Sequence, residues 1–309
     1  MDLYSIGEMV IDFIPGKEPD SYIRMAGGAP ANVAVAVSKN GLKAGMNCSV
    51  GDDDFGRFLI ETLECYGVRP LTRRRCKEAI TTMAFVTLRS DGERSFTFAR
   101  KPGADMFLYE DDVREEDIGE SVIVHGGSCS LSAAPASAAT EKALRLGSEM
   151  GKLVSFDVNY RSSMWNDDVD VCAAKVLECL PYVDLLKVSE EEAGMFFKQR
   201  TPESLMEQYG LALIVETLGS RGARAYFDGH VIDMPGRKAS CVDATGAGDA
   251  FWGGLLSCLR IQNVERASDL TDVNILRALN YGNVAGWLCV QKKGALQSLP
   301  TREEIEKYL

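Results

Sequence analysis

The chain has 309 residues, of which 46% are hydrophobic and 26% charged, so it can bury a sizeable core. Its 34 Lys and Arg residues are outnumbered by 45 Asp and Glu residues, and the net charge of −11 disfavours binding to nucleic acid or to an anionic membrane surface. No apolar run approaches the roughly 18 residues that span a bilayer, and the acidic first segment, MDLYSIGEMVIDFIP, does not resemble a secretory signal. The nine Cys residues form no CxxC pair and there are two His residues, so neither a disulfide framework nor a zinc site is indicated. We therefore expect a cytoplasmic protein.

Short, mostly apolar runs alternate with helical patterns along the chain. The runs are LYSIGEMVIDFI, SVIVHGG, KLVSFDVN, DLLKVS and LALIVETLG, and the helical patterns cover 136–150, 169–179, 190–197 and 274–289. Strands that alternate with helices build βαβ units, in which parallel strands are covered by helices on both faces. We predict an α/β fold, a doubly wound and mostly parallel sheet flanked by helices, with residues 1–309 as a single domain.

One stretch breaks this alternation. TTMAFVTLRSDGERSFTFAR contains two β-rich segments joined by Ser90, Asp91 and Gly92, and Asp-Gly between alternating segments is a strong hairpin signal. Another candidate strand, SYIRMAGG, occurs earlier in the chain. Together they predict a small β-sheet lid formed from about residues 13–25 and 80–100.

The segment DATGAGDAFWGG, residues 243–254, looks suited to phosphate and yet carries no lysine. Apolar residues recur at helical spacing after it, so Gly246, Ala247 and Gly248 should lie in the first turn of a helix, where free N–H groups attract an anion. A tight turn with glycines for close packing is the alternative. A P-loop is disfavoured because no Gly-Lys pair is followed by Ser or Thr, and a dinucleotide fingerprint because the glycines lie late in the chain and lack the third member.

Asp249 is the informative residue of this segment. A carboxylate at this position would repel a polyphosphate unless it faced a different group. A hydroxyl nucleophile is such a group, because phosphoryl transfer to an alcohol needs a base for its proton and donors for the charge on the phosphoryl oxygens. A single helical turn could therefore supply both the base, Asp249, and the N–H groups that bind the phosphoryl oxygens.

The same segment is similar to the C-terminal signature of the ribokinase-like (PfkB) carbohydrate kinases, and AGGAPANVAVA, residues 26–36, resembles their N-terminal signature. The resemblance covers essentially the whole chain and is greatest to fructokinases, through ERSFTFARKPGAD and DVNYRSSMW. It implies a ribokinase-like fold and an ATP- and Mg²⁺-dependent kinase, with D-fructose converted to fructose 6-phosphate as the favoured reaction. Asp249 would then be the catalytic base, and the amides of Gly246, Ala247 and Gly248 the anion hole. A helix-capping role is the alternative for Asp249.

The resemblance also implies a set of sugar contacts. Asp12 ends the first candidate strand, and parallel-sheet proteins bind ligands at the carboxyl ends of strands. Guanidinium donors suit hydroxyl, carboxylate or phosphate oxygens. Each of these residues also has a simpler explanation. Asp12 could be a solvated acid in a loop, Asn32 could only begin a helix, and Arg100 and Arg161 could form surface ion pairs. The expected sugar-binding residues are Asp12, Gly27, Gly28, Asn32, Arg100 and Arg161.

Nucleotide and metal positions follow from the same resemblance. The expected nucleotide-binding residues are Lys187, Thr217, Gly219, Gly222 and Asn283, and a monovalent cation, K⁺, is implied at Asp243, Thr245, Gly294 and Ser298. Glu192 occupies the acidic position that helps to organise Mg²⁺ through water, although Ser189 replaces the usual Asn. A charged first helical turn and a glycine-rich connection are the alternatives for KVSEEEA and TLGSRGA.

Other functions stay open at this point. A 2-keto-3-deoxygluconate kinase is the alternative within the class, because Arg100 and Arg161 suit a sugar-acid carboxylate. A catalytically silent sugar- or nucleotide-binding regulator is the alternative from another class, although it would have no need of a base at Asp249. A nicotinamide-dependent oxidoreductase lacks the early glycine fingerprint. The resemblance further implies a homodimer through the lid, and no nucleic-acid or membrane partner is expected.

Overall fold

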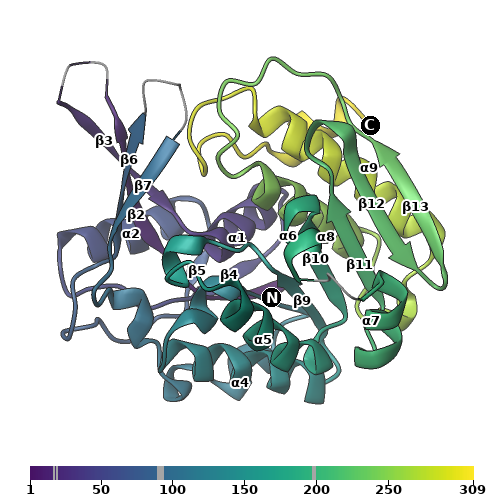
Figure 1. The fold of residues 1–309 in the computed structure, drawn as a ribbon, viewed down its shortest axis with the longest axis horizontal. Coiled ribbons are helices and arrows are strands. Elements are labelled where there is room, and N and C mark those ends of the chain that lie inside the picture. The colour runs from purple at the N-terminus through teal and green to yellow at the C-terminus, as the bar shows by residue number, and fades with distance from the viewer. Residues whose placement is uncertain (17, 19, 89–93, 197–199) are drawn as a thin grey trace.

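The computed structural model describes residues 1–16, 18, 20–88, 94–196 and 200–309. Within them, nine strands form one large sheet in the order β13-β12-β11-β10-β9-β8-β1-β4-β5 (Figure 1). The strands from β11 to β5 pair in parallel, and β12 and β13 add an antiparallel edge. The predicted fold class, a doubly wound and mostly parallel sheet flanked by helices, is confirmed.

The large sheet consists of β1 (Leu3–Ile6), β4 (Ala44–Asn47), β5 (Arg69–Pro70), β8 (Ile123–Gly127), β9 (Leu153–Asp157), β10 (Leu185–Ser189), β11 (Leu213–Thr217), β12 (Gly222–Phe227) and β13 (His230–Pro235). The α-helices are α1 (Ala29–Lys39), α2 (Asp54–Cys65), α3 (Glu115–Gly119), α4 (Ala136–Glu149), α5 (Val169–Cys179), α6 (Glu190–Phe196), α7 (Pro202–Tyr209), α8 (Ala247–Ile261), α9 (Asp272–Cys289) and α10 (Arg302–Glu306).

Alternate residues of the parallel strands face opposite sides of the large sheet. Leu153, Leu185 and Leu213 pack in one core with residues of α1, α2, α8 and α9. Val154 and Leu186, each the next residue along its strand, pack in a second core with residues of α4 to α7. Because helices bury both faces, these strands have nearly continuous apolar sequences, which made them recognisable.

Helix α8 packs closely against α1 and α9 because it carries two adjacent glycines. A Cβ atom on Gly253 would lie 2.5 Å from the Cβ atom of Ala36 in α1, and one on Gly254 would lie 2.9 Å from that of Ala285 in α9. Both distances are shorter than real Cβ contacts, so a larger residue at either position would push a helix away. The last two glycines of DATGAGDAFWGG therefore fix the position of α8 between its neighbours.

The first apolar run, LYSIGEMVIDFI, forms two strands in different sheets. β1 ends at Ile6, and the chain then turns at Gly7, which has a φ of +147°. β2 (Val10–Pro15) belongs to the small sheet, so Asp12 lies in that sheet and not at the end of the first strand.

The small sheet contains four strands among the described residues, in the order β3-β2-β6-β7. Besides β2 they are β3 (Tyr22–Gly27), β6 (Met83–Leu88) and β7 (Arg94–Ala99); β2 pairs with β6 in parallel, and the other neighbours are antiparallel. Figure 1 shows this sheet extending from the body at the upper left. Phe13 stacks on Phe85 with ring centroids 5.0 Å apart and meets Phe55 of α2 edge-on, which anchors the sheet. The expected turn at residues 90–92 lies outside the described residues.

In the part of the chain that the structure describes, no helix is both long enough and apolar enough to cross a membrane.

Candidate active site

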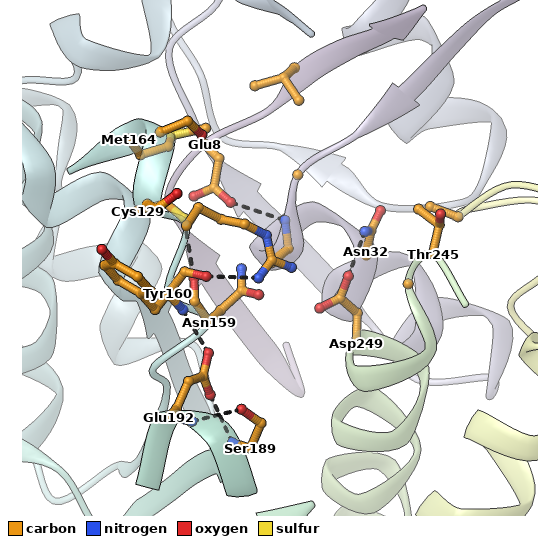
Figure 2. Close-up of a pocket in the computed structure, with 18 of the residues that line it drawn as sticks. Glu8, Asn32, Cys129, Asn159, Tyr160, Met164, Ser189, Glu192, Thr245 and Asp249 are labelled. Atoms are coloured by element: carbon orange, nitrogen blue, oxygen red, sulfur yellow. Dashed lines mark hydrogen bonds between the residues drawn. The ribbon is translucent and has the colours of Figure 1, made fainter. Parts of the chain in front are cut away.

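A cavity of about 590 Å³ lies where the carboxyl ends of β9 and β10 meet the small sheet and the first turns of α1 and α8. Figure 2 shows Asn32, Thr245 and Asp249 on one side of it, and Tyr160, Ser189 and Glu192 on another. The predicted site residues that line this cavity are Asp12, Gly28, Asn32, Arg161, Glu192, Thr245, Gly246 and Asp249. The structure thus brings together residues that are far apart in the sequence.

Asp249 lies in the first turn of α8, which follows Gly246 in the left-handed conformation (φ +76°). Asn32 Nδ2 donates a hydrogen bond of 2.7 Å to Asp249 Oδ2, and both side chains are buried. Burial, followed by the Asp157 carboxylate, raises the pKa of Asp249, whereas the Asn32 hydrogen bond and the charges of Lys187 and Arg161 oppose that rise. The carboxyl group is therefore held in a fixed position with a raised affinity for a proton.

The backbone N–H groups in the first turn of α8 point out of the N-terminal end of the helix, as they do in any helix. The Ala247 N–H donates to Ala244 O at 3.2 Å, and the Ala250 N–H donates to Gly246 O at 2.8 Å. Of the three amides predicted to form an anion hole, that of Ala247 is therefore already engaged within the turn, while Gly246 lines the cavity.

Asn32 reaches Asp249 because two glycines let α1 begin beside the cavity. Gly28, the N-cap of α1, has a φ of +118°, and a Cβ atom there would lie 2.4 Å from Glu8 O. At Gly27 a Cβ atom would lie 2.3 Å from Asp12 Oδ2. Only glycine fits either position without displacing its neighbours, so this segment holds its backbone close to both acids.

Lys187 and Asp157 form a buried ion pair beneath the glycine-rich turn. They are register partners on β10 and β9, and Lys187 Nζ lies 2.8 and 2.7 Å from the two carboxylate oxygens. A Cβ atom on Gly248 would lie 3.4 Å from the same Nζ. Although burial lowers the pKa of Lys187, the carboxylates of Asp157 and Glu192 raise it above its ordinary value, so the side chain stays charged. The turn therefore has a lysine behind it, supplied by a neighbouring strand.

Asp12 projects from β2 into the cavity and is mostly buried. Burial raises the pKa of Asp12 to about 6, and the positive charge of Arg161 partly offsets this effect. Arg161 lines the cavity too and donates from Nη1 to its neighbour Tyr160 O at 2.9 Å. The two side chains place one carboxyl group and one guanidinium cation in the wall of the same cavity.

Arg100, the other predicted arginine, is paired within the protein. Its Nε donates to Asp105 Oδ2 at 2.8 Å and its Nη2 donates to Ser132 Oγ at 3.1 Å. The side chains of Arg100 and Asp105 are 8% and 1% exposed, and Arg100 is not among the described residues that line the cavity.

Glu192 joins two loops at the edge of the cavity. Its Oε1 accepts the Tyr160 N–H and its Oε2 accepts the Ser189 N–H, both at 2.7 Å (Figure 2). Ser189 Oγ accepts the Glu192 N–H in return, at 3.1 Å. Ser189, which departs from the usual Asn, thus serves as a cap for α6.

Of the predicted nucleotide positions, Thr217, Gly219 and Gly222 lie at or just after the carboxyl end of β11, and Asn283 lies in α9; none of these four lines the cavity. Thr217 Oγ1 donates to Val188 O at 3.4 Å, and Gly219 and Gly222 adopt positive φ values of 58° and 108° in the turn that follows. Asn283 in α9 donates from Nδ2 to Met234 O and Pro235 O at 3.3 and 3.2 Å, which ties α9 to the end of β13.

The four residues predicted to surround a monovalent cation come together behind α8. Asp243 accepts the Thr245 N–H on Oδ1 at 2.9 Å and the Gly294 N–H on Oδ2 at 3.0 Å. Ser298 Oγ lies 3.0 Å from the Sγ atom of Cys289. The Asp243 carboxylate therefore joins the segment that leads into α8 to the segment at Gly294. Across the described ranges, no three His, Cys, Asp or Glu residues are grouped so as to hold a metal ion by themselves.

Sequence reasoning missed several residues of the cavity wall. Glu8 lines the cavity and is 4% exposed, and Cys129, Met164 and Met195 also belong to the lining. Glu8 was detectable in principle, because it is one of only two acids in the apolar run LYSIGEMVIDFI, and acids are seldom buried without a partner. The sulfur-containing residues carried no signal, since such residues are ordinarily core material.

The doubly wound sheet, the small sheet beside the carboxyl ends of its strands, and a carboxylate in a glycine-rich helix start define the ribokinase-like class of kinases. The chain matches the pfkB family carbohydrate kinases over residues 2–302. It is 37% identical over 316 residues to fructokinase-1 of Oryza sativa subsp. japonica, covering 99% of this chain and 96% of that protein. The chain belongs to the pfkB family of carbohydrate kinases.

Solved structures agree with this assignment. Fructokinase with bound ATP from Xylella fastidiosa superposes with a TM-score of 0.92 at 29% identity, covering 99% of this chain and 97% of that one. Fructokinase from Vibrio cholerae O395, in a form with fructose, ADP and calcium ion bound, gives a TM-score of 0.88 at 32% identity over 100% and 98% of the two chains. The resemblance to ribokinase-like kinases, and to fructokinases in particular, is thereby confirmed.

Proposed function

We propose that this carbohydrate kinase is an ATP-dependent fructokinase, which transfers the γ-phosphoryl group of ATP to the 6-hydroxyl of D-fructose. The observation that carries the proposal is the Asp249 carboxylate, buried at the start of α8, oriented by Asn32 and facing a cavity of about 590 Å³. The fructokinase relatives over nearly the full chain support the choice of sugar.

Asp249 acts as the general base in this mechanism. As the sugar hydroxyl oxygen attacks the γ-phosphorus atom in line, its proton passes to an oxygen of Asp249. The bond from the γ-phosphorus to the bridging oxygen breaks, and ADP leaves with the electron pair of that bond. Burial raises the pKa of Asp249, which strengthens it as a base.

Positive charge for the phosphoryl oxygens comes from two sources in this chain. The N–H groups of Gly246 and Gly248 at the start of α8 face the phosphoryl oxygens, because a helix N-terminus stabilises an anion, and the Ala247 N–H joins them by exchanging its bond to Ala244 O. The Lys187 ammonium lies directly behind Gly248 and, because Asp157 fixes it, stands in place before the reaction begins. Lys187 therefore contributes to phosphate binding through its fixed positive charge.

The sugar is held by groups on both sides of the cavity. Asp12 accepts hydroxyl donors, and the Gly27–Gly28 backbone lies against the ring. Asn32 offers its Oδ1, which has no hydrogen-bond partner among the described residues, and Arg161 donates to sugar oxygens. Arg100 acts indirectly, because its hydrogen bonds orient Asp105 and Ser132.

ATP binds beside the sugar at Thr217, Gly219, Gly222 and Asn283 in this proposal. Mg²⁺, when bound with the nucleotide, neutralises charge on the phosphates. The ion would be held by phosphate oxygens and water, and Glu192, which lines the cavity, would accept a hydrogen bond from that water. K⁺ fits the oxygens of Asp243, Thr245, Gly294 and Ser298, where it would steady the turn that carries the anion hole.

We further propose a cytoplasmic homodimer formed through the small sheet. Tyr22 and Ile23 are 50% and 45% exposed on β3, which among the described residues is an edge strand of the small sheet. Proteins usually cover an exposed edge strand that carries apolar side chains.

The decisive test is ADP release with MgATP across a panel of ketoses, keto sugar acids and nucleosides, with and without K⁺. We expect the highest kcat/KM with fructose. Higher kcat/KM with 2-keto-3-deoxygluconate would reassign the substrate, and no sugar-dependent ADP with any compound would leave a catalytically silent binding protein as the better description.

A further inference from the structure

Glu8 is a buried acid in the cavity wall to which no role has been assigned above. It lies between β1 and β2, where the chain passes from the large sheet to the small one, and it is 4% exposed. Its Oε1 accepts the Ala29 N–H at 3.0 Å, which caps the start of α1. Among the described residues, its Oε2 has no hydrogen-bond partner. One carboxylate oxygen of Glu8 therefore has a hydrogen-bond partner among the described residues and the other has none.

The surroundings of Glu8 make that half-satisfied state costly. Burial raises the pKa of Glu8 to about 7; its own amide and the Ala29 N–H oppose this, while Asp105 adds to the rise and Arg100 reduces it. Figure 2 shows Glu8 near Cys129 and Met164, and the Glu8 carboxylate, after burial, helps to raise the pKa of the Cys129 thiol. A glutamine would cap Ala29 equally well through its carbonyl oxygen, without a buried charge. The cap alone thus does not account for a carboxyl group here.

Glu8 and Asp249 belong to the same cavity but lie apart in it (Figure 2). Asp249 faces the hydroxyl that is phosphorylated, on the function proposed above. A group at Glu8 therefore meets a different part of the same acceptor molecule.

We propose that Glu8 is a specificity residue, whose Oε2 bonds one hydroxyl of the acceptor sugar remote from the phosphorylated hydroxyl while its Oε1 holds the α1 start in place. The ligand class is a polyhydroxylated sugar, because a hydroxyl can donate to the ionised form of Glu8 and can accept from the protonated form. This inference rests on the proposed sugar-kinase function and adds a contact to it.

The test combines a variant with altered sugars. Glu8→Gln keeps the size and the acceptor for the Ala29 N–H, but it replaces the free oxygen with an NH₂ group. The kcat/KM of wild type and variant is measured with fructose and with its 1-, 3- and 4-deoxy analogues, and the melting temperature of both proteins is recorded.

We expect the wild type to lose roughly 10- to 100-fold in kcat/KM with one of these analogues, as for a lost hydrogen bond to a charged group. In Glu8→Gln that one penalty should shrink several-fold while the other penalties stay the same. The exposed Glu149→Gln, in the Arg145 ion pair of α4, serves as the matched control and should reproduce every wild-type penalty.

Two results would overturn the proposed role of Glu8 while leaving the proposed sugar-kinase function intact. If fructose is phosphorylated and all deoxy penalties are equal in wild type and Glu8→Gln, Glu8 only caps α1. If Glu8→Gln melts well below the wild type, the same comparison is made with Glu8→Asp, and equal penalties there lead to the same conclusion. A wild-type protein inactive on every sugar would instead overturn the proposed function, and this inference with it.

Discussion

Asn32 donates a hydrogen bond to Asp249 across 217 positions of the chain, and it joins the glycine-rich start of α1 to that of α8. Because this bond favours the ionised carboxylate, it opposes the rise in pKa that burial and Asp157 cause. Asn32 therefore orients the Asp249 carboxylate and lowers its affinity for a proton.

Asn32→Leu should raise the pKa of Asp249 and lower kcat. A hydrogen bond to a charged group contributes about 1.5–3 kcal/mol, so the acid limb of the kcat–pH profile should move to higher pH by about one to two units. The profile of kcat against pH, measured at saturating fructose and ATP, checks this. An unshifted acid limb would mean that Asn32 contacts the sugar without influencing the base.

Asp12→Asn should stabilise the protein at neutral pH while weakening sugar binding. The pKa of Asp12 is raised from 3.8 to about 6 in the folded state, so folding favours the protonated form. The resulting penalty is absent below about pH 4, grows as the pH rises from about 4 to about 6, and stays at about 1–3 kcal/mol above that. Asp12→Asn removes it, so the gain in unfolding free energy should be larger at pH 8 than at pH 4.5.

Urea denaturation at the two pH values measures that gain, and KM for fructose should rise at least about tenfold in the same variant. A variant that is equally destabilised at both pH values would show that Asp12 is a structural acid and not one strained by burial.

Lys187→Met should destabilise the fold by about 3–5 kcal/mol, because it leaves Asp157 buried without its partner. Lys187→Met combined with Asp157→Asn removes both charges and should recover much of that loss, while kcat stays low for want of the charge behind Gly248. Lys175→Met, which breaks an exposed pair with Glu178, should change stability by less than about 1 kcal/mol. Chemical denaturation and kcat on all three proteins separate the effects; full activity in the double variant would exclude a phosphate role for Lys187.

Gly28→Ala should disable the site far more than Gly41→Ala. Both residues have positive φ values, of 118° and 80°, so each alanine meets backbone strain of about 1–2 kcal/mol. Only at Gly28 would the new Cβ atom also meet Glu8 O, at 2.4 Å, whereas nothing lies within 4 Å of that at Gly41. We expect kcat/KM to fall by at least about tenfold in Gly28→Ala alone. Equal activity in the two variants would show that the start of α1 can shift without loss.

The large sheet was predictable because its strands are buried on both faces. A run such as KLVSFDVN is apolar over consecutive residues, since Leu153 faces one helical layer and Val154 the other. The change of sheet at Gly7 was not predictable, because apolar residues resume directly after it. A Cβ atom at Gly7 would lie 2.7 Å from Pro30 Cγ, and one sequence does not show such a close approach.

The centre of the site was predictable from two short signatures, but its ion pairs were not. Lys187 meets Asp157 through the pairing register of β9 and β10, and Arg100 turns to Asp105 within a folded loop. Neither pairing has a spacing that identifies it in one sequence. Glu8 was overlooked for a related reason, since its cap on Ala29 bridges segments 21 residues apart.

The most direct measurement is the product and rate of the reaction with MgATP and fructose, for the wild type and for Asp249→Asn. The account predicts that ³¹P and ¹³C NMR find the new phosphate on the 6-hydroxyl, and that Asp249→Asn lowers kcat by about 10²- to 10⁴-fold while it still binds ATP in calorimetry. Phosphate on another hydroxyl, no transfer to fructose, or near-normal kcat in Asp249→Asn would contradict it.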